Sequence, residues 1–331
     1  MPQLSCSVVI ASYNGWELLQ PCLRALESQT RAPEQVLVVD NGSRDGTSAE
    51  LRRAFPAVEV LPLGGNLGFA AANNQGILRS ESDVVVLLNN DTEAEPEFLA
   101  RLLAPLEADR SLGAVAATMV FAGAPSVVAS AGIEVYRNGL ALDRALGCER
   151  AALRDQEVFG PSAGAAAYRR AALEDVGSFP ETFFMYLEDV DLAWRLRLRG
   201  WRTWQASGAV VRHAYSASAV EGSDFKRRLL ARNRVWLLAR CLPRPLLARH
   251  GWRVLRYDAL AFGYGLATRD WATAAGRVVA LGGLGRRVRE RRAIQSGATA
   301  EWTEIERWLL PEPSAREMLR LRHLAARHAV G

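Results

Sequence analysis

The amino-acid sequence predicts an α/β fold with a mainly parallel, twisted sheet flanked by helices, followed by a helical C-terminal extension. In the N-terminal third of the chain, short apolar runs alternate with segments of helical periodicity. That alternation is typical of a parallel sheet whose strands are connected by helices. Beyond residue 224 the pattern changes to long, arginine-rich segments that favour helices.

The N-terminal elements are expected in a regular order. Apolar runs predict four strands, at 7–12, 36–40, 58–61 and 84–88. Helical spacing of apolar side chains predicts intervening helices at 15–28, 48–55 and 68–79. Right-handed connections between parallel strands then place helices on both faces of the sheet.

The pattern is less regular after residue 110. Short strands are expected at 113–121, 165–168, 202–205 and 209–213, and a hairpin at 132–142 turns through Arg137-Asn138-Gly139. A helix at 189–199 is expected to end at Gly200, because glycine commonly follows the last helical turn. We expect the main boundary of the chain near residue 220.

Several classes of protein are disfavoured by the composition. The start of the chain lacks the basic and apolar segments of a signal peptide. No run of apolar residues is long enough to predict a membrane-spanning helix. The four cysteines have no ligand-like spacing, which is typical of reduced thiols. We therefore expect a cytoplasmic protein.

The charge is divided unevenly along the chain. Residues 1–220 contain 19 Lys and Arg against 26 Asp and Glu, whereas residues 221–331 contain 22 against 10 and hold five of the nine tryptophans. Arginine and tryptophan together suit the surface of an anionic membrane. The alternative is a helical cap that packs its tryptophans on the first region and pairs its arginines with the acidic surface there.

The buried strand expected at 84–88 leads directly into Asn89-Asn90-Asp91. Ligands bind at the carboxyl ends of the strands in open α/β sheets, and a carboxylate there can hold a hard cation against a phosphate. His213 ends another expected strand, so it is a candidate metal ligand beside Asp91. The alternatives are a strand-terminal turn and a structural histidine.

Other polar groups follow the first strands. Asp40-Asn41 can hydrogen-bond a ribose or a base, or can cap the next helix. Ser12-Tyr13-Asn14 stands where a dinucleotide-binding fold would carry its glycine fingerprint, which disfavours that class. Asn73 and Asn74 are poor helix formers within their expected helix. They either lie near a ligand or form an amide network that stabilises the fold.

Three carboxylates, Glu188, Asp189 and Asp191, crowd the start of the helix expected at 189–199. Asp191 and Arg195 are four residues apart and could pair on the helix surface. Negative charge at a helix start is also favoured by the helix dipole. The functional interpretation is a general base whose pKa is adjusted by nearby aromatic side chains.

Taken in order, these segments resemble the family 2 inverting glycosyltransferases of the GT-A fold, and their bacterial rhamnosyltransferase-like branch in particular. The matching stretches lie within about residues 6–218 and read VVIASYNG, VLVVDNGSRDGT, GGNLGFAAANNQGI, VVVLLNNDTE, SAGAAAYRRAALEDVGSFPETFFMYLEDVDLAWRLRLRGW and VVRHAYSAS. The resemblance implies a nucleotide-diphosphate sugar donor, with dTDP-rhamnose favoured, a Mg²⁺ or Mn²⁺ ion, and a single displacement. The acceptor is expected to be a glycan or lipid-linked hydroxyl in cell-surface polysaccharide synthesis, reached from the cytoplasm or at the inner membrane face, and no nucleic acid is expected as a partner.

The resemblance also implies residue roles. Asp91 and His213 would hold the metal, and Asp189 would be the catalytic base with Glu188 beside it. Asn89 stands where many relatives carry an acid, which predicts modest metal affinity. Donor binding is expected from Ser12, Tyr13, Asn14, Asp40, Asn41, Asn66, Asn74, Asn89 and Asn90.

The expected domains follow from the same resemblance. Residues 1–220 would form the catalytic domain, with a nucleotide-sugar-binding half at about 1–110 and an acceptor half at about 111–220. Residues 221–331 would form a basic helical region that carries no family motif.

Two other classes stay open at this point. A sugar-phosphate nucleotidyltransferase of related fold usually has a glycine-rich basic loop after its first strand, where this chain has SYNGW. A catalytically silent sugar-nucleotide-binding module would not need Asp91, Asp189 and His213 together. Hydrolysis of the donor distinguishes an enzyme from a binding module.

Overall fold

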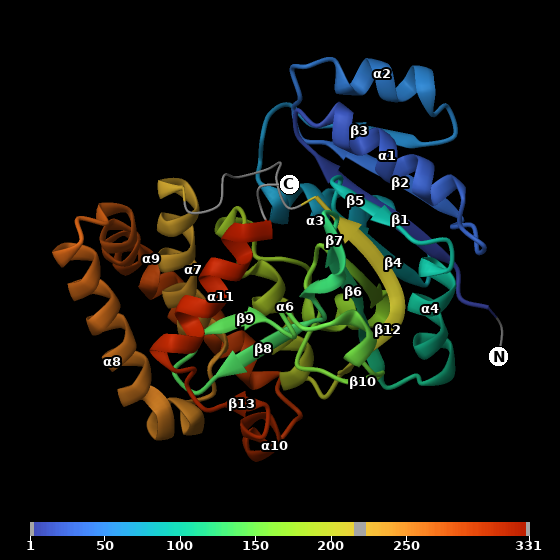
Figure 1. Cartoon of the computed structure of the whole chain (residues 1–331). Helices are drawn as coiled ribbons and strands as arrows, with labels where there is room; N and C mark the ends of the chain where they lie inside the picture. The colour runs from blue at the N-terminus through green and yellow to red at the C-terminus, as the bar shows by residue number, and fades with distance from the viewer. Residues whose placement is uncertain (1–2, 215–222, 329–331) are drawn as a thin grey trace.

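A ten-stranded sheet forms the centre of the part of the chain that the structure, a computed structural model, describes: residues 3–214 and 223–328 (Figure 1). Its main path runs β10 (Gln156–Glu157), β12 (Arg202–His213), β6 (Leu112–Phe121), β11 (Ala165–Arg169), β4 (Val84–Leu88), β1 (Cys6–Ser12), β2 (Gln35–Asp40) and β3 (Glu59–Pro62). Two further strands lie off this path, β5 (Thr92–Ala94) against β12 and β7 (Ala124–Ser130) against β6.

The strands β1 to β4 pair in parallel, as do β6 and β12. Strand β11 lies between β4 and β6 and is antiparallel to both. The predicted α/β class with a mainly parallel sheet is therefore confirmed, with antiparallel strands added toward the β10 edge.

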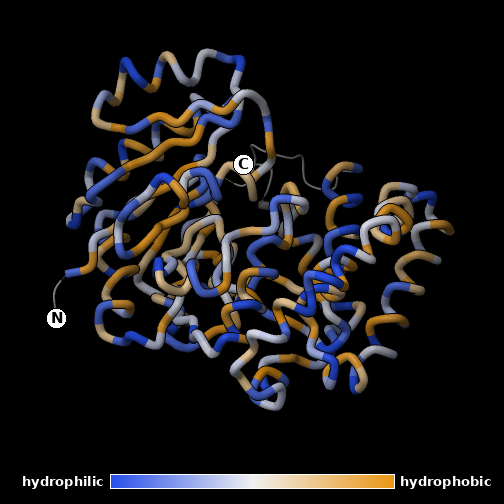
Figure 2. The backbone as a smooth tube through the Cα atoms, turned by 180° about the vertical axis from the view of Figure 1, so that it is seen from behind, coloured by the Kyte–Doolittle hydropathy of each residue, from blue (hydrophilic) through white to orange (hydrophobic). Residues whose placement is uncertain are grey.

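Helices cover both faces of this sheet. The elements concerned are α1 (Trp16–Glu27), α2 (Thr47–Ala54), α3 (Phe69–Arg79), α4 (Phe98–Ala108), α5 (Arg170–Val176) and α6 (Glu188–Leu198). Successive side chains of a strand point to opposite faces, so Val84, Val86 and Leu88 enter one core while Val85 and Leu87 enter another. Because both cores are apolar, the sequence of β4 is an unbroken hydrophobic run. Such runs appear as orange stretches in Figure 2.

A second, small sheet joins distant parts of the chain. The predicted hairpin forms β8 (Ile133–Tyr136) and β9 (Ala141–Asp143), and β13 (Leu309–Leu310) pairs in parallel with β8. Two short 3-10 helices lie elsewhere in the part of the chain before residue 224: η1 (Arg150–Ala152) and η2 (Glu181–Phe183).

The C-terminal region is helical, as the sequence predicts. It comprises α7 (Asp224–Cys241), α8 (Arg244–Ala267), α9 (Trp271–Ser296), α10 (Trp302–Glu306) and α11 (Ala315–His328), with α7 to α9 to the left of the sheet in Figure 1. Among the described helices, none combines the length and apolar character needed to cross a membrane. A third core packs Trp194 of α6 with Leu237 and Leu238 of α7, so this region contacts the sheet-bearing part directly.

The structure differs from the expectation at several elements. Residues 202–213 form one strand with a register shift between Gln205 and Val210, rather than two strands. The elements α4, α5, β5, β7 and β10 were not expected. The expected boundary near residue 220 lies outside the described residues, so the division into domains stays a prediction.

A buried ion-pair cluster joins α6 to the C-terminal helices. The fully buried carboxylate of Asp191 accepts from Arg195 Nε at 2.7 Å, which confirms the predicted pair, and from Arg240 Nε at 2.7 Å. Arg240 also pairs with Glu290 of α9. Although burial opposes ionisation, the two arginines lower the pKa of Asp191 below its usual value. One carboxylate thus connects α6, α7 and α9.

Replacing Asp191 by Asn leaves two buried guanidinium groups without their common charge. Breaking a buried ion pair costs about 3–5 kcal/mol, so we expect the free energy of unfolding to fall by that amount in urea titrations at neutral pH. Because the pKa of Asp191 is lowered, its contribution is present at neutral pH and is lost as the pH falls through the folded-state pKa.

Glu97→Gln is the matched control. Glu97 and Arg101 form a pair with the same four-residue spacing, but their side chains are 61% and 53% exposed. Exposed pairs contribute about 0–1 kcal/mol, so the control should unfold nearly like the wild type. Equal losses in both variants would contradict the role assigned to Asp191.

Candidate active site

The carboxyl end of β4 and the end of β12 bring Asp91 and His213 together. The carboxylate Oδ1 of Asp91 lies 3.0 Å from Nε2 of His213, and the amide Nδ2 of Asn89 lies 3.3 Å from the same nitrogen. Strand β5 returns along β12 with Thr92 opposite His213, which fixes this approach. The sequence therefore correctly anticipated that these side chains share one edge of the sheet.

Asn90 connects the end of β4 to the end of β1. Its Nδ2 donates to Oγ of Ser12 at 3.2 Å, and both side chains are buried. A Cβ atom on Gly15 would lie 2.4 Å from Asn90 Nδ2, so a larger residue at the start of α1 would displace the Asn90 amide. The predicted donor-binding residues Ser12 and Asn90 are thus adjacent.

The residues after β1 and β2 hold each other in place. Asn14 has a left-handed φ of 48°; its N–H donates to Ser43 Oγ, and its Oδ1 accepts from the N–H of Arg44. Tyr13 is 46% exposed, so its ring is available to a ligand at this edge. The buried carboxylate of Asp40 accepts from the N–H of Ser43 and from the hydroxyl of Ser48. These bonds hold the turn between β2 and α2 without capping the backbone of α2, whose N-terminus has no side-chain cap. Contact of Asp40 with a base or ribose stays a prediction.

Asn41 and Asn66 form an amide network beyond β2. Asn41 Nδ2 donates to Asn66 Oδ1 at 3.1 Å, and Asn41 Oδ1 accepts from the N–H of Leu67. The loop then reaches Gly68, where a Cβ would lie 2.5 Å from the carbonyl oxygen and ring of Phe184. This close contact places the loop before α3 against the segment that leads into α6.

Asn74 forms its hydrogen bonds away from the other candidates. Its amide donates to the carbonyl of Phe179 at 2.9 Å and to Glu181 at 3.1 Å, and its Oδ1 accepts from the N–H of Phe179. These contacts correspond to the fold-stabilising alternative. Donor binding by Asn74 stays a prediction that no observed contact favours.

The three carboxylates at the start of α6 have different environments. Burial raises the pKa of Asp189 to about 6, against the opposing effect of hydrogen bonds from the N–H groups of Ala163 and Val190. Burial, followed by the negative charge of Asp189, raises the pKa of Glu188 well above its usual value. Asp191 differs from both, because Arg195 and Arg240 lower its pKa below the usual value. Only Asp189 is both partly exposed and poised to titrate near neutral pH.

The segment before α6 is held by a residue that the sequence analysis missed. Phe184, Tyr186 and Leu187 all have left-handed φ angles, near 66° to 70°. The buried amide of Asn233 in α7 donates to the carbonyls of Phe183, Met185 and Tyr186 at 3.0, 2.9 and 2.8 Å. A backbone this unusual needs such support from its surroundings, so α7 helps to position the residues leading to Asp189.

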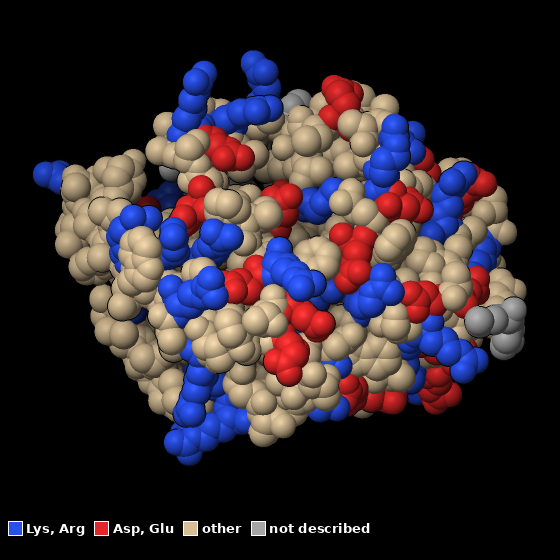
Figure 3. Space-filling model, turned by 90° about the horizontal axis from the view of Figure 1, so that it is seen from below, with Lys and Arg blue, Asp and Glu red and all other residues tan. Residues whose placement is uncertain are grey.

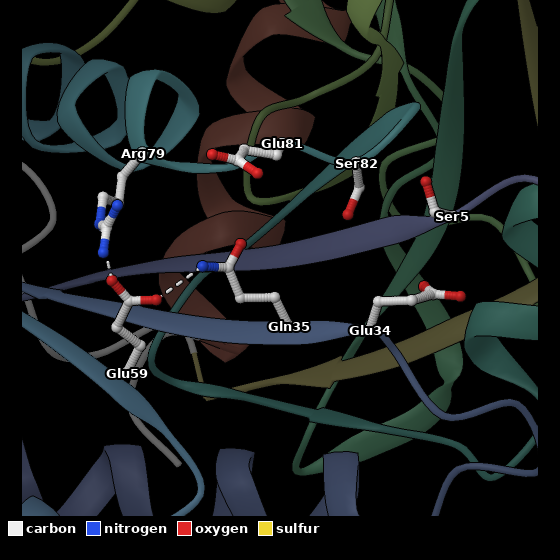
Figure 4. A pocket seen from close by; sticks show the side chains of 7 residues that line it. All are labelled: Ser5, Glu34, Gln35, Glu59, Arg79, Glu81 and Ser82. Atoms are coloured by element: carbon white, nitrogen blue, oxygen red, sulfur yellow. Dashed lines mark hydrogen bonds and ion pairs between the residues drawn. The ribbon is translucent and has the colours of Figure 1, made fainter.

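A hollow of the described surface lies at the opposite edge of the sheet. It measures about 580 Å³ and is lined by Ser5, Glu34, Gln35, Glu59, Arg79, Glu81 and Ser82 (Figure 4). These residues surround the amino ends of β1, β2 and β4, away from Asp91 and Asp189. Arg79 pairs with Glu59, which also accepts from Gln35. The candidates Asp91, Ser12 and Asn90 lie instead at the carboxyl ends of β4 and β1.

Comparisons with known proteins agree with this architecture. An N-acetylglucosaminyl-diphospho-decaprenol L-rhamnosyltransferase of Mycobacterium tuberculosis is 31% identical over 231 residues, covering 62% of this chain and 75% of that protein. The solved mannosyltransferase of Pyrobaculum calidifontis in complex with GDP-Man and Mn²⁺ has a TM-score of 0.54 at 19% identity, covering 100% of this chain and 87% of that one. The structure of GalNAc-T7 with UDP, GalNAc and Mn²⁺ has a TM-score of 0.57 at 16% identity. That match covers 80% of this chain and spans 57% of the GalNAc-T7 chain.

The family itself is shown by a direct match. The model of the family described as "Glycosyl transferase family 2" matches residues 7–177, which include the strands β1 to β4 and the Asn89-Asn90-Asp91 segment. That range is just over half of the chain, and the solved relatives share its fold. The chain belongs to the family 2 glycosyltransferases.

Proposed function

We propose that this enzyme transfers a sugar from a nucleotide-diphosphate donor to a hydroxyl of a glycan or lipid-linked glycan, with inversion at the anomeric carbon. The similarity to the mycobacterial rhamnosyltransferase favours dTDP-rhamnose as the donor and a cell-surface polysaccharide as the product. The observation that carries the reaction type is Asp189, a carboxylate whose raised pKa of about 6 suits a general base.

The carboxyl edge of the sheet fits a divalent cation. Two neighbouring ligands of an octahedral ion with bonds near 2.1 Å lie roughly 3 Å apart. The 3.0 Å between Asp91 Oδ1 and His213 Nε2 matches that separation. Among the described residues, no group of three or more His, Cys, Asp or Glu could hold a metal, so donor phosphates and water must complete the shell. A carboxylate with an imidazole suits Mn²⁺, and a bound ion would supply charge stabilisation for the leaving diphosphate.

The remaining groups have roles that this geometry supports. We assign the donor to the edge formed by Ser12, Tyr13, Asn14 and Asn90. Asp189 then accepts the proton of the acceptor hydroxyl while that oxygen attacks the anomeric carbon. Glu188 is buried beside it, and burial together with the charge of Asp189 raises the pKa of Glu188 well above its usual value, which favours its neutral form.

The first test removes the proposed base. Asp189→Asn should reduce turnover at least about a hundredfold with little change in donor binding, because general-base catalysis typically contributes that factor. In the wild type, kcat/KM should fall as the pH decreases through about 6, where Asp189 becomes protonated.

Two variants act as controls in that experiment. Glu174→Gln changes an exposed carboxylate of α5 and should behave like the wild type. Glu188→Gln keeps the size of the buried side chain but cannot ionise, and it should retain most of the activity. If Glu188→Gln is inactive while Asp189→Asn turns over normally, the base is Glu188 and the proposal is wrong.

Stability gives a second readout for Asp189. Its folded-state pKa is raised, so the folded protein binds more protons than the unfolded chain between about pH 4 and 6. Ionised Asp189 therefore destabilises the fold above that range. Asp189→Asn should melt at or above the wild-type temperature at pH 8, and a large drop in melting temperature would contradict the burial argument.

The metal proposal is tested by binding as well as by activity. Asp91→Ala should weaken the binding of Mn²⁺ with donor, followed by calorimetry or by the Mn²⁺ spin-resonance signal, and excess EDTA should abolish transfer in the wild type. Glu93→Ala, an exposed acid two residues further along, is the control and should bind like the wild type. Full activity in EDTA would leave Asp91 and His213 as a structural pair.

A further inference from the structure

Large apolar side chains are exposed on the outer sides of α8 and α9. We define the hairpin face as Leu260 and Tyr264 of α8, which are four residues apart and share one side of that helix, with Trp271, Val278 and Leu281 of α9. Their exposed fractions are 67%, 63%, 62%, 56% and 64%, respectively. Single exposed apolar residues are ordinary, but a set of this size on two connected helices marks an interaction surface.

The two helices form one unit at this face. Only residues 268–270 separate them, and a Cβ on Gly265 would lie 3.3 Å from the carbonyl oxygen of Asp270 and 3.7 Å from the nitrogen of Ala274. The end of α8 therefore packs directly on the start of α9. The apolar residues nearest this junction, Tyr264 and Trp271, carry polar ring groups as well as large apolar surfaces.

The surroundings of the hairpin face are basic. Residues 244–296 contain 11 arginines and three acidic residues. Each acid is held in ion pairs, Asp258 with Arg234 and Arg277, Asp270 with Arg227, and Glu290 with Arg240, Arg286 and Arg287. Exposed arginines follow the apolar stretch along α9, at Arg286, Arg289 and Arg292. In Figure 3 the left end of the molecule is largely uncharged and is bordered by Lys and Arg side chains.

We propose that the hairpin face binds the surface of an anionic lipid bilayer. Leucine and valine side chains reach the boundary of the acyl chains, while tryptophan and tyrosine suit the headgroup level. The arginines along the border meet lipid phosphates, which supply the complementary charge. An acidic protein could match the arginines, but it would not match five exposed apolar side chains without an apolar surface of its own.

The hairpin face is connected to the approach to Asp189. Asp270, at the turn between α8 and α9, pairs with Arg227 of α7 through Oδ1 and Nε at 3.1 Å. Two residues earlier, Phe225 packs edge-to-face on Phe184 with ring centroids 6.0 Å apart. Phe184 belongs to the segment that leads into α6. A bilayer on the hairpin face would therefore lie near the acceptor side of the site, where it suits an acceptor whose lipid anchor stays in the membrane.

Vesicle binding of the full chain tests this inference. Phosphatidylcholine vesicles that contain phosphatidylglycerol should bind the wild type at least about tenfold more strongly at low salt than pure phosphatidylcholine vesicles do, and high salt should reduce the difference. Leu260→Ser with Leu281→Ser should abolish most of the binding. Arg289→Gln with Arg292→Gln should weaken binding and its salt dependence.

Leu78→Ser is the matched control for the leucine changes. Leu78 lies on α3, outside the hairpin face, and is 79% exposed, so its replacement should leave vesicle binding unchanged. Melting curves of all variants verify that they fold. Absence of sedimentation with anionic vesicles, or equal losses in the control and the double variant, would overturn the proposal.

A second copy of the chain is the competing occupant of this face. If light scattering without vesicles detects a dimer that Leu260→Ser with Leu281→Ser dissociates, and vesicles do not bind, the face is a subunit interface and the proposal is wrong. The inference is independent of the donor assignment. A failed sugar-nucleotide test with intact vesicle binding would count against the donor alone.

Discussion

The pairing of Asp191 with Arg195 and Arg240 is the interaction on which the arrangement of this protein depends. It lies two residues beyond the proposed base and fixes α6 to α7 on one side. On the other side, Arg195 donates to the carbonyls of residues 176–178. These residues are the last residue of α5 and the first two of the loop that follows it. A charged cluster without solvent demands good geometry, so the orientation of α6, and with it Asp189, is tightly restricted.

The features that were predictable from the sequence are those set by local pattern. The strand at 84–88 is buried on both faces, so its sequence is an unbroken apolar run, and that run predicts the strand. Asp191 and Arg195 are neighbours on a helix simply because they are four residues apart. Asp91 and His213 were placed together because each ends a strand of one sheet, and topology then determines their proximity.

Other features depend on contacts between distant segments and were not predictable. Asn233 lies about 50 positions after the carbonyls it binds, and nothing near it in the sequence distinguishes it from any other helical asparagine. Asn74 could have faced a ligand or a neighbouring loop, and only the packed structure shows it bonded to Phe179. The sequence predicted separate strands at 202–205 and 209–213, whereas the structure has the single strand β12 with a register shift between Gln205 and Val210.

The end of α6 has a consequence for how the protein is made. The carbonyl of Leu198 accepts from the N–H groups of Thr299 and Ala300 at 2.8 and 3.1 Å, and β13 completes the small sheet from residues 309–310. Both contacts need segments that leave the ribosome long after α6 does. The parallel strands β1 to β4 can assemble during translation, whereas α6 can form these contacts only after residues 299–310 have been made. A nascent chain can therefore form its parallel strands before α6 reaches its final position.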